Sequence, residues 1–325
     1  MSVPAAVRIV EVSPRDGLQN EAQFVALATR IELIERLAKA GLRHVEAAAF
    51  VSPKAVPQMA DSAQLMAKLQ TIVLRAQLTL SALVPNERGL EAALAAGVDE
   101  VAVFAAASES FSQRNIQCSI SESLRRFEPL VARAQQAGLR VRGYVSCVLG
   151  CPYEGEIAKQ AAAAVAGALF EMGCAEISLG DTIGTGRPAG VRALIETVSQ
   201  RVPIASLAGH FHDTWGMAIA NVLTAWEAGV RVFDASVGGL GGCPYAPGAR
   251  GNVATEDVVW LMQGMGVNLT TAIDLDALVD TAAWMSAQLG RPPASRVSQA
   301  RLAQRERCGL SGMPENRDAK FVSQA

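Results

Sequence analysis

Two of the three histidines in this 325-residue chain stand two positions apart. His210 and His212 occur in GHFHDTWG (209–216), far from His44 in the sequence. Residues i and i+2 of a β-strand point to the same face, whereas a helix would bring residues i and i+4 together. Two imidazoles side by side are a good start for a metal site. The pair therefore predicts a metal-binding strand, provided that other ligands meet it.

Two further segments offer such ligands. SPRDGLQNE (13–21) contains Arg15 and Asp16, and GGLGGCPYAPGARGN (238–252) contains Cys243 and Asn252. Asp16 and the carbonyl oxygen of Asn252 could join the histidines. A mixed nitrogen and oxygen set with open positions suits Mg²⁺, Mn²⁺ or Fe²⁺ better than a closed structural zinc site. Such a metal could act as a Lewis acid on a chelating alcohol, and Arg15 could stabilise charge on a carbonyl oxygen.

Strand-like and helix-like segments alternate along the chain and place these groups. The expected strands are 8–13, 44–50, 78–84, 100–107, 140–149, 175–181, 204–213 and 232–239. The expected helices are 30–41, 59–70, 87–97, 121–138, an alanine-rich segment ending at Gly173, 190–202, 217–229 and 254–266. Eight consecutive βα units predict a closed (β/α)8 TIM barrel, with its chemistry at the carboxyl ends of the strands. The second possibility is an open doubly wound sheet, but no GxGxxG follows the first strand.

Barrel closure would make the eighth strand a neighbour of both the first and the seventh, so that the polar segments meet. Glu46, a carboxylate inside an apolar strand, then calls for a partner such as Arg15. We expect a catalytic barrel over 1–270 and a helical extension packed on it over 271–300. We expect a tail over 301–325 that is disordered or forms an oligomer contact.

Composition excludes several other classes of function. The formal net charge is −2 and no basic run occurs, which argues against nucleic acid or an anionic membrane as partner. No apolar run is long enough for a transmembrane helix, and the N-terminus lacks a signal-peptide pattern. The six cysteines include no CxxC, so we expect a reducing cytoplasm.

Several segments in this order resemble one family. EVSPRDGLQNE (11–21), RGYVSCVLGCPYEG (142–155), HFHDTWG (210–216) and GGLGGCPYAPGARGNVATED (238–257) are similar to the 3-hydroxy-3-methylglutaryl-CoA lyases of the DRE-TIM metallolyase group. The resemblance runs from about residue 7 to about residue 300. It implies a retro-Claisen cleavage of 3-hydroxy-3-methylglutaryl-CoA to acetyl-CoA and acetoacetate. It also implies an acyl-CoA substrate, and we expect a homo-oligomer, most simply a dimer.

The resemblance assigns roles to residues of this chain. It implies that a divalent metal, Mg²⁺ or Mn²⁺, is held by Asp16, His210, His212 and Asn252. It implies that Arg15 steadies the enolate of the leaving thioester, that Cys243 transfers a proton and that His210 doubles as an acid or base. It also implies supporting roles. The Glu46 carboxylate would support the site, and Glu256 would brace the loop that carries Asn252. Asn115 and Gln19 would contact CoA.

The sequence also departs from the family pattern. Ala47, Ala48 and Ala49 replace hydroxyl residues, and Trp215 and Met217 replace Tyr and Gln. These apolar changes predict a roomier acyl pocket, which leaves open a bulkier 3-hydroxy-3-alkylglutaryl-CoA as substrate. Three further classes of protein stay open. They are a Claisen-type synthase on the same barrel, a non-haem iron oxygenase with two histidines and Asp16, and a non-catalytic binding protein.

Overall fold

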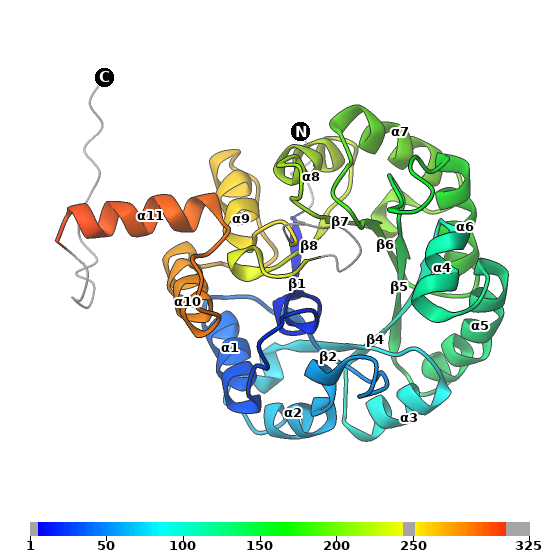
Figure 1. The fold of residues 1–325 in the computed structure, drawn as a ribbon, viewed down its shortest axis with the longest axis horizontal. Helices are drawn as coiled ribbons and strands as arrows, with labels where there is room; N and C mark the ends of the chain where they lie inside the picture. The colour runs from blue at the N-terminus through cyan, green and yellow to red at the C-terminus, as the bar shows by residue number, and fades with distance from the viewer. Residues whose placement is uncertain (1–5, 243–250, 310–325) are drawn as a thin grey trace.

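Eight parallel strands close into a barrel in the computed structural model, which describes residues 6–242 and 251–309. The strands follow one another around the barrel in chain order, and β8 closes it against β1 (Figure 1). Their bounds are β1 Arg8–Glu11, β2 His44–Ala49, β3 Thr79–Leu83, β4 Glu100–Ala106, β5 Arg140–Ser146, β6 Glu176–Asp181, β7 Leu207–Phe211 and β8 Val232–Ala235. The closed barrel confirms the predicted fold class and rules out the open sheet.

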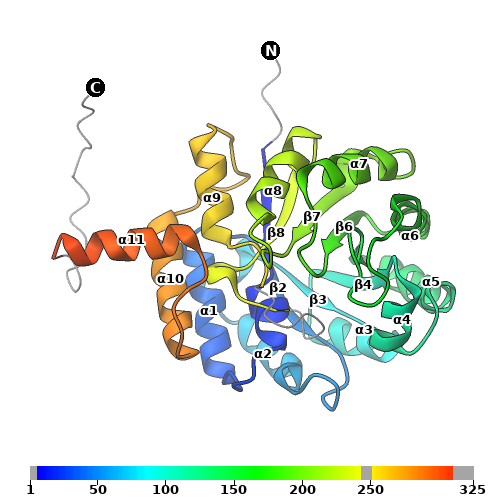
Figure 2. The same ribbon diagram turned by 45° about the horizontal axis from the view of Figure 1, so that its top comes forward.

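Helices surround the barrel on its outer side (Figures 1 and 2). Their bounds are α1 Leu27–Lys39, α2 Ser62–Leu69, α3 Glu87–Ala95, α4 Glu109–Ile116, α5 Ile120–Gln136, α6 Lys159–Glu171, α7 Pro188–Val198, α8 Ala218–Glu227, α9 Thr255–Gly264, α10 Leu275–Gln288 and α11 Arg296–Arg307. The sequence pattern does not predict helix α4, because this helix is short and mostly polar. None of the described helices is long and apolar enough to cross a membrane.

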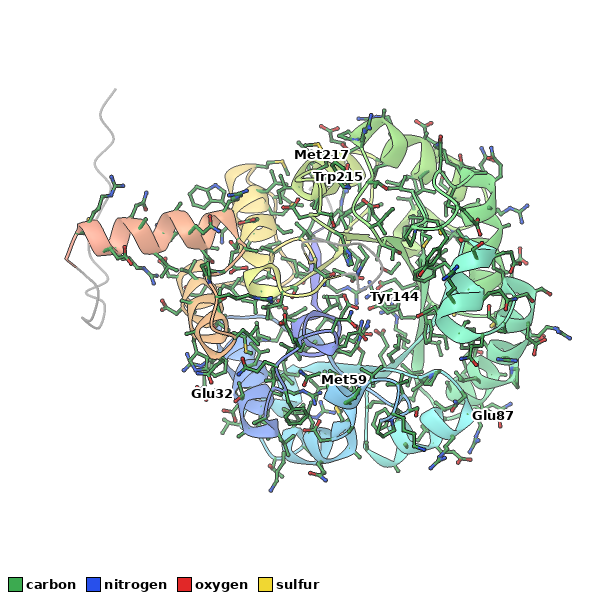
Figure 3. The ribbon with its side chains drawn as sticks, viewed as in Figure 1. Glu32, Met59, Glu87, Tyr144, Trp215 and Met217 are labelled. Atoms are coloured by element: carbon green, nitrogen blue, oxygen red, sulfur yellow. The ribbon has the colours of Figure 1, made fainter. Side chains whose placement is uncertain are left out.

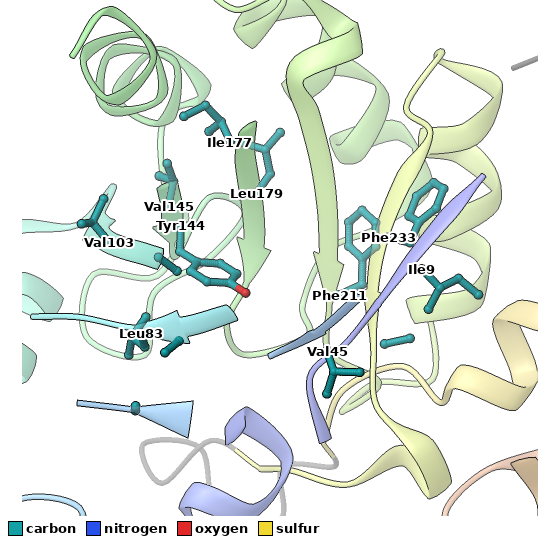
Figure 4. Close-up of a cluster of buried hydrophobic side chains, with 14 of the residues drawn as sticks. Ile9, Val45, Leu83, Val103, Tyr144, Val145, Ile177, Leu179, Phe211 and Phe233 are labelled. Carbon is teal, nitrogen blue, oxygen red and sulfur yellow. The ribbon is translucent and has the colours of Figure 1, made fainter. Parts of the chain in front are cut away.

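The two faces of the strands have different surroundings. The outward face packs against the helices in one large apolar cluster, which includes Ile9, Val45 and Phe233 (Figure 4). A much smaller cluster consists of Val10, Val12, Ala208 and Val232. Val10 and Asp234 are register partners, and Asp234 contacts side chains of β5, β6 and β7, so this small cluster lies inside the barrel.

Charged side chains fill much of the remaining barrel interior. Arg142 forms ion pairs with Glu176 (2.9 Å) and Asp234 (2.6 Å), and Glu176 also pairs with Arg8. Arg142, Glu176 and Asp234 are almost completely buried. Because an isolated charge is very costly to bury, each of these side chains can be buried only together with its charged partners.

The segment after α9 returns to the barrel. Thr271 Oγ1 donates to the carbonyl of Gly41, and the amide of Asp274 donates to the carbonyl of Ala40 (both 2.8 Å). Helix α10 then packs along α1, whereas α11 projects away from the barrel (Figure 1). The boundary predicted at residue 300 falls inside α11, which continues to Arg307; residues 310–325 lie outside the described part of the chain.

Gly41 gives a test of how tightly this segment docks. Its φ is +103°, and a Cβ atom there would lie 2.1 Å from the carbonyl oxygen of Ala272. Gly138, after α5, has a φ of +80° but no atom within 4 Å of such a Cβ. Gly138→Ala should lower the free energy of unfolding only by the strain of the left-handed backbone, about 1–2 kcal/mol. Gly41→Ala should lower it by clearly more, because its Cβ would also collide with Ala272. Urea unfolding of both variants measures the two free energies. Equal decreases for Gly41→Ala and Gly138→Ala would contradict the tight contact at Gly41.

Candidate active site

The ends of β1 and β7 bring three predicted ligands together. Nε2 of His210 lies 3.3 Å from Nε2 of His212 and 3.8 Å from Oδ2 of Asp16. One ligand atom from each of the three residues lies within 4.8 Å of the others. Asp16 reaches this position from a single π-helical turn, Ser13–Gly17, that begins directly after β1. The three groups thus form a cluster of the size that one metal ion could occupy.

Asn252 adjoins this cluster from the segment after β8. Its Nδ2 donates to Oδ2 of Asp16 (2.9 Å) and to the carbonyl of Leu240 (3.2 Å). Residue Asn252 also pairs with His212 in an isolated antiparallel β-bridge. Its Oδ1 is buried and has no hydrogen-bond partner within residues 6–242 and 251–309. A buried amide oxygen without a partner is costly unless something else binds it. Two imidazole nitrogens and two amide or carboxylate oxygens therefore fit a hard divalent cation.

Arg15 is fixed beside this cluster by two carboxylates. Its Nε donates to Oε2 of Glu46 (2.8 Å), its Nη2 contacts the same oxygen, and its Nη1 donates to Oδ1 of Asp16 (2.9 Å). Gln19 Nε2 also donates to Oδ1 of Asp16 (2.8 Å). The pairing of Arg15 with Glu46 agrees with the expectation from the sequence. It leaves a buried guanidinium with a defined orientation at the site.

Electrostatics keep two of the clustered groups without a proton. Burial favours the neutral form of Asp16, but the charges of Arg15 and the imidazoles outweigh it, so the pKa of Asp16 is lowered. Burial, assisted by repulsion from His210, lowers the pKa of His212 to about 4. Near neutral pH, Asp16 is therefore ionised and His212 is neutral, which are the forms that bind metal ions.

A cavity of about 730 Å³ opens over this cluster. Arg15, Asp16, His210 and His212 line it, as do Gln19, Asn115 and Tyr144. The ends of β3 and β4, across the barrel from β7 and β8, and helix α4 add an apolar wall of Leu83, Phe104, Phe111 and Ile116. The cavity thus combines a polar end with an apolar wall, as binding sites for small molecules commonly do.

The apolar departures noted in the sequence lie elsewhere. Ala47, Ala48 and Ala49 are buried in the core and are not among the described residues that line the cavity. Trp215 and Met217 are 70% and 39% exposed and stand well away from Tyr144 (Figure 3). The prediction that these five residues enlarge the acyl pocket is therefore wrong. Ala47, Ala48 and Ala49 belong to strand β2 and are buried in the core. For Trp215 and Met217, a sequence does not show on which side of a loop a side chain lies.

Two further predicted residues have different outcomes. Cys243 lies outside the described residues. Glu256, at the start of α9, accepts the amide of Gly238 on both carboxylate oxygens (3.0 Å each) and Ser298 Oγ on Oε1 (2.7 Å). It thereby joins the turn after β8 to α9 and α11, close to the segment that carries Asn252.

Sequence reasoning missed the residues behind the imidazoles. Asp234 on β8 accepts from Arg142 Nη2 (2.6 Å) and Ser178 Oγ (2.8 Å), and it lies 3.0 Å from Nδ1 of His210. Arg142 also donates to the hydroxyl of Tyr144 (2.9 Å). Burial opposes ionisation of Asp234, but Arg142 and His210 hold its pKa well below the usual range. The available signal was a charged residue at an alternating position of an apolar strand.

A closed (β/α)8 barrel with imidazoles, a carboxylate and an arginine at the carboxyl ends of its strands is an architecture of enzymes. Residues 6–285 match the HMGL-like family model. The chain is 56% identical to hydroxymethylglutaryl-CoA lyase of Pseudomonas mevalonii over 93% of its length and 99% of that protein. The chain belongs to the HMGL-like family.

Other relatives give the same picture. A 3-hydroxy-3-isohexenylglutaryl-CoA/hydroxymethylglutaryl-CoA lyase of Pseudomonas aeruginosa is 54% identical over 93% of this chain and 99% of its own. A crystal structure of hydroxymethylglutaryl-CoA lyase from that organism has a TM-score of 0.89 at 54% identity, covering 94% of this chain and 100% of its own. These relatives are all named as lyases, which favours that class over a synthase, an oxygenase or a binding protein.

Glu256 allows a test of the brace near Asn252. Burial raises its pKa to about 8. Since an unfolded glutamate titrates near 4.5, the folded state binds the extra proton between these values, and this contribution to stability is lost as the pH rises. The Tm of the wild type relative to that of Glu256→Gln should therefore fall as the pH rises from about 4.5 to about 8, and should level off at higher pH. A constant difference in calorimetry would show that Glu256 does not titrate there.

Proposed function

We propose that the protein cleaves 3-hydroxy-3-methylglutaryl-CoA to acetyl-CoA and acetoacetate. The observation that carries this proposal is the convergence of Asp16, His210 and His212 within 4.8 Å of one another, in a cavity that also exposes Arg15. Membership in the HMGL-like family supports it, and so do the lyases that share about half of the residues.

The reaction is a retro-Claisen cleavage. The C3 hydroxyl gives up its proton, and its oxygen becomes the ketone of acetoacetate as the C2–C3 bond breaks. The electron pair of that bond forms the enolate of the thioester, which takes up a proton at C2 to give acetyl-CoA. The site must therefore supply a base for the hydroxyl, a stabiliser for the enolate oxygen and an acid for C2.

Asp16, His210, His212 and Asn252 are the residues that would hold a divalent metal, Mg²⁺ or Mn²⁺. When bound, the metal would act as a Lewis acid that lowers the pKa of the substrate alcohol. The donor chemistry of these four residues and the unpartnered Oδ1 of Asn252 support this assignment.

The remaining roles belong to side chains around the cluster. Arg15, held by Glu46, would face the enolate oxygen with a guanidinium whose orientation is already set. Such a preorganised donor contributes about 3–4 kcal/mol to transition-state stabilisation. We assign proton transfer to Cys243, with His210 as the second candidate for the acid or base.

The CoA part of the substrate would lie toward α4. Asn115 is on this helix and lines the cavity, which supports a contact to CoA. Gln19 also lines the cavity, but its amide donates to Asp16, so its proposed contact to CoA would use the carbonyl oxygen. A related lyase of Acinetobacter baumannii, 34% identical with a TM-score of 0.85 over 98% of both chains, was solved with coenzyme A and 3-methylmalate.

We also propose a homodimer in the cytoplasm. The projecting helix α11 offers a surface for a second copy (Figure 2). No disulfide joins cysteines within the described residues, which suits a reducing compartment. Light scattering during size-exclusion chromatography would give the mass in solution.

Metal dependence and substrate can be tested together. Purified protein with 3-hydroxy-3-methylglutaryl-CoA should form acetoacetate, lose this activity in excess chelator, and regain it with Mg²⁺ or Mn²⁺. Asp16→Ala should lower kcat/KM by more than ~10²-fold, because loss of a ligand should exceed the 10–100-fold effect of losing a residue behind one. Glu32→Gln, an exposed change on α1, is the matched control. Full turnover by protein shown to be metal-free would contradict the proposal.

A longer C3 substituent is the second candidate substrate. The relative named for both isohexenyl and methyl substrates supports it, as does the apolar wall of Leu83, Phe104, Phe111 and Ile116. If this wall accepts the chain, kcat/KM should differ between the two substrates by no more than ~10–200-fold, the effect of a modest change in apolar contact. Steady-state kinetics with both thioesters measures the ratio. If kcat/KM for the longer thioester is lower by several orders of magnitude, this second proposal is wrong and only the methyl substrate remains.

A further inference from the structure

Asp234 is joined to the proposed metal site through one hydrogen bond. Register places it beside His210 on the neighbouring strand, and its Oδ2 lies 3.0 Å from Nδ1 of the imidazole. The carboxylate is almost completely buried, and His210 is about nine-tenths buried. The contact is therefore shielded from solvent, where a water molecule could otherwise replace either partner.

The surroundings of Asp234 decide which way this hydrogen bond runs. Arg142 Nη2 donates to Oδ1 and Ser178 Oγ donates to Oδ2. The ion pair with the buried guanidinium keeps the carboxylate ionised, and an ionised carboxylate can only accept hydrogen bonds. The proton between Asp234 and His210 must therefore be on Nδ1 of the imidazole.

A neutral imidazole carries one proton, so a proton on Nδ1 leaves the lone pair on Nε2. Nε2 of His210 is the atom that faces Nε2 of His212 and Oδ2 of Asp16. We propose that Asp234 is a positioning residue, which holds His210 in the Nδ1–H tautomer and in the ring orientation that a metal ion requires. This inference rests on the proposed function, because it assumes that His210 binds the metal.

The competing explanation is that Asp234 only neutralises Arg142. Arg142 is buried and would need a counter-charge whether or not His210 binds anything. The two explanations differ in what they predict for the imidazole. A counter-ion sets no tautomer, whereas a positioning residue does.

The tautomer can be measured directly, since the chain contains only three histidines. Long-range ¹H–¹⁵N spectra of the metal-free protein, recorded where the imidazoles are neutral, distinguish Nδ1–H from Nε2–H. His44→Gln and His212→Gln would assign the signals. We expect the Nδ1–H form for His210 in the wild type. The Nε2–H form would overturn the proposal without any variant of Asp234.

Metal affinity gives the second readout. Asp234→Asn keeps the shape of the side chain, but its amide can donate to Nδ1 and so favour the wrong tautomer. Titration calorimetry with Mn²⁺ should show a Kd that is 10–100-fold higher than that of the wild type. Ser178→Ala is the matched control, because it removes a donor to the same oxygen but leaves the contact between Asp234 and His210 in place, and its Kd should rise less than that of Asp234→Asn. Circular dichroism would verify that both variants fold.

The outcomes separate this inference from the proposed function. If the wild type binds no Mn²⁺, the metal-dependent function fails and the inference fails with it. If the wild type binds Mn²⁺ and folded Asp234→Asn binds it equally well, only the positioning role is wrong. If Asp234→Asn does not fold, the tautomer of His210 in the wild type still tests the proposal, because the Nε2–H form would contradict it.

Discussion

The contact between the Asp234 carboxylate and the Arg142 guanidinium links the fold of this protein to its site. Both groups are buried inside the barrel, where neither charge is stable alone. Their pairing requires that β5 and β8 face each other across a closed barrel of one particular register. The same carboxylate then reaches His210, so the arrangement that neutralises the interior also orients the cluster at the mouth.

Closure also determines which strand ends meet. Strand β8 pairs with β1 through Val10 and Asp234 and with β7 through His210 and Asp234. A shift of one residue in either pairing would turn Asp234 toward the helices. Behind the site, the buried Glu11 accepts the amide of Val237 (3.0 Å) and Thr255 Oγ1 (2.6 Å), which joins the end of β1 to the segments that follow β8.

The sequence was sufficient for the barrel and for the cluster at its mouth. The alternation of strand-like and helix-like segments is a local signal, and the spacing of His210 and His212 needs only the geometry of one strand. Asp234 was not predicted, although it follows the same rule that singled out Glu46, because its role depends on inter-strand register. Register is set by closure of the whole barrel, which no local pattern encodes. The direction of Trp215 and Met217 is likewise a property of loop packing.

The two unlike faces of each strand separate two kinds of evolutionary change. The outward residues, such as Ile9 and Phe233, contact helices and can be exchanged for other apolar residues wherever a helix shifts to match. Charged inward residues such as Arg142 and Asp234 contact partners on distant strands, so the exchange of one requires the exchange of another elsewhere. Along each strand, freedom to vary should therefore alternate with a period of two. Descendants of this barrel could then drift far apart in their outer shells while the polar interior stays the same.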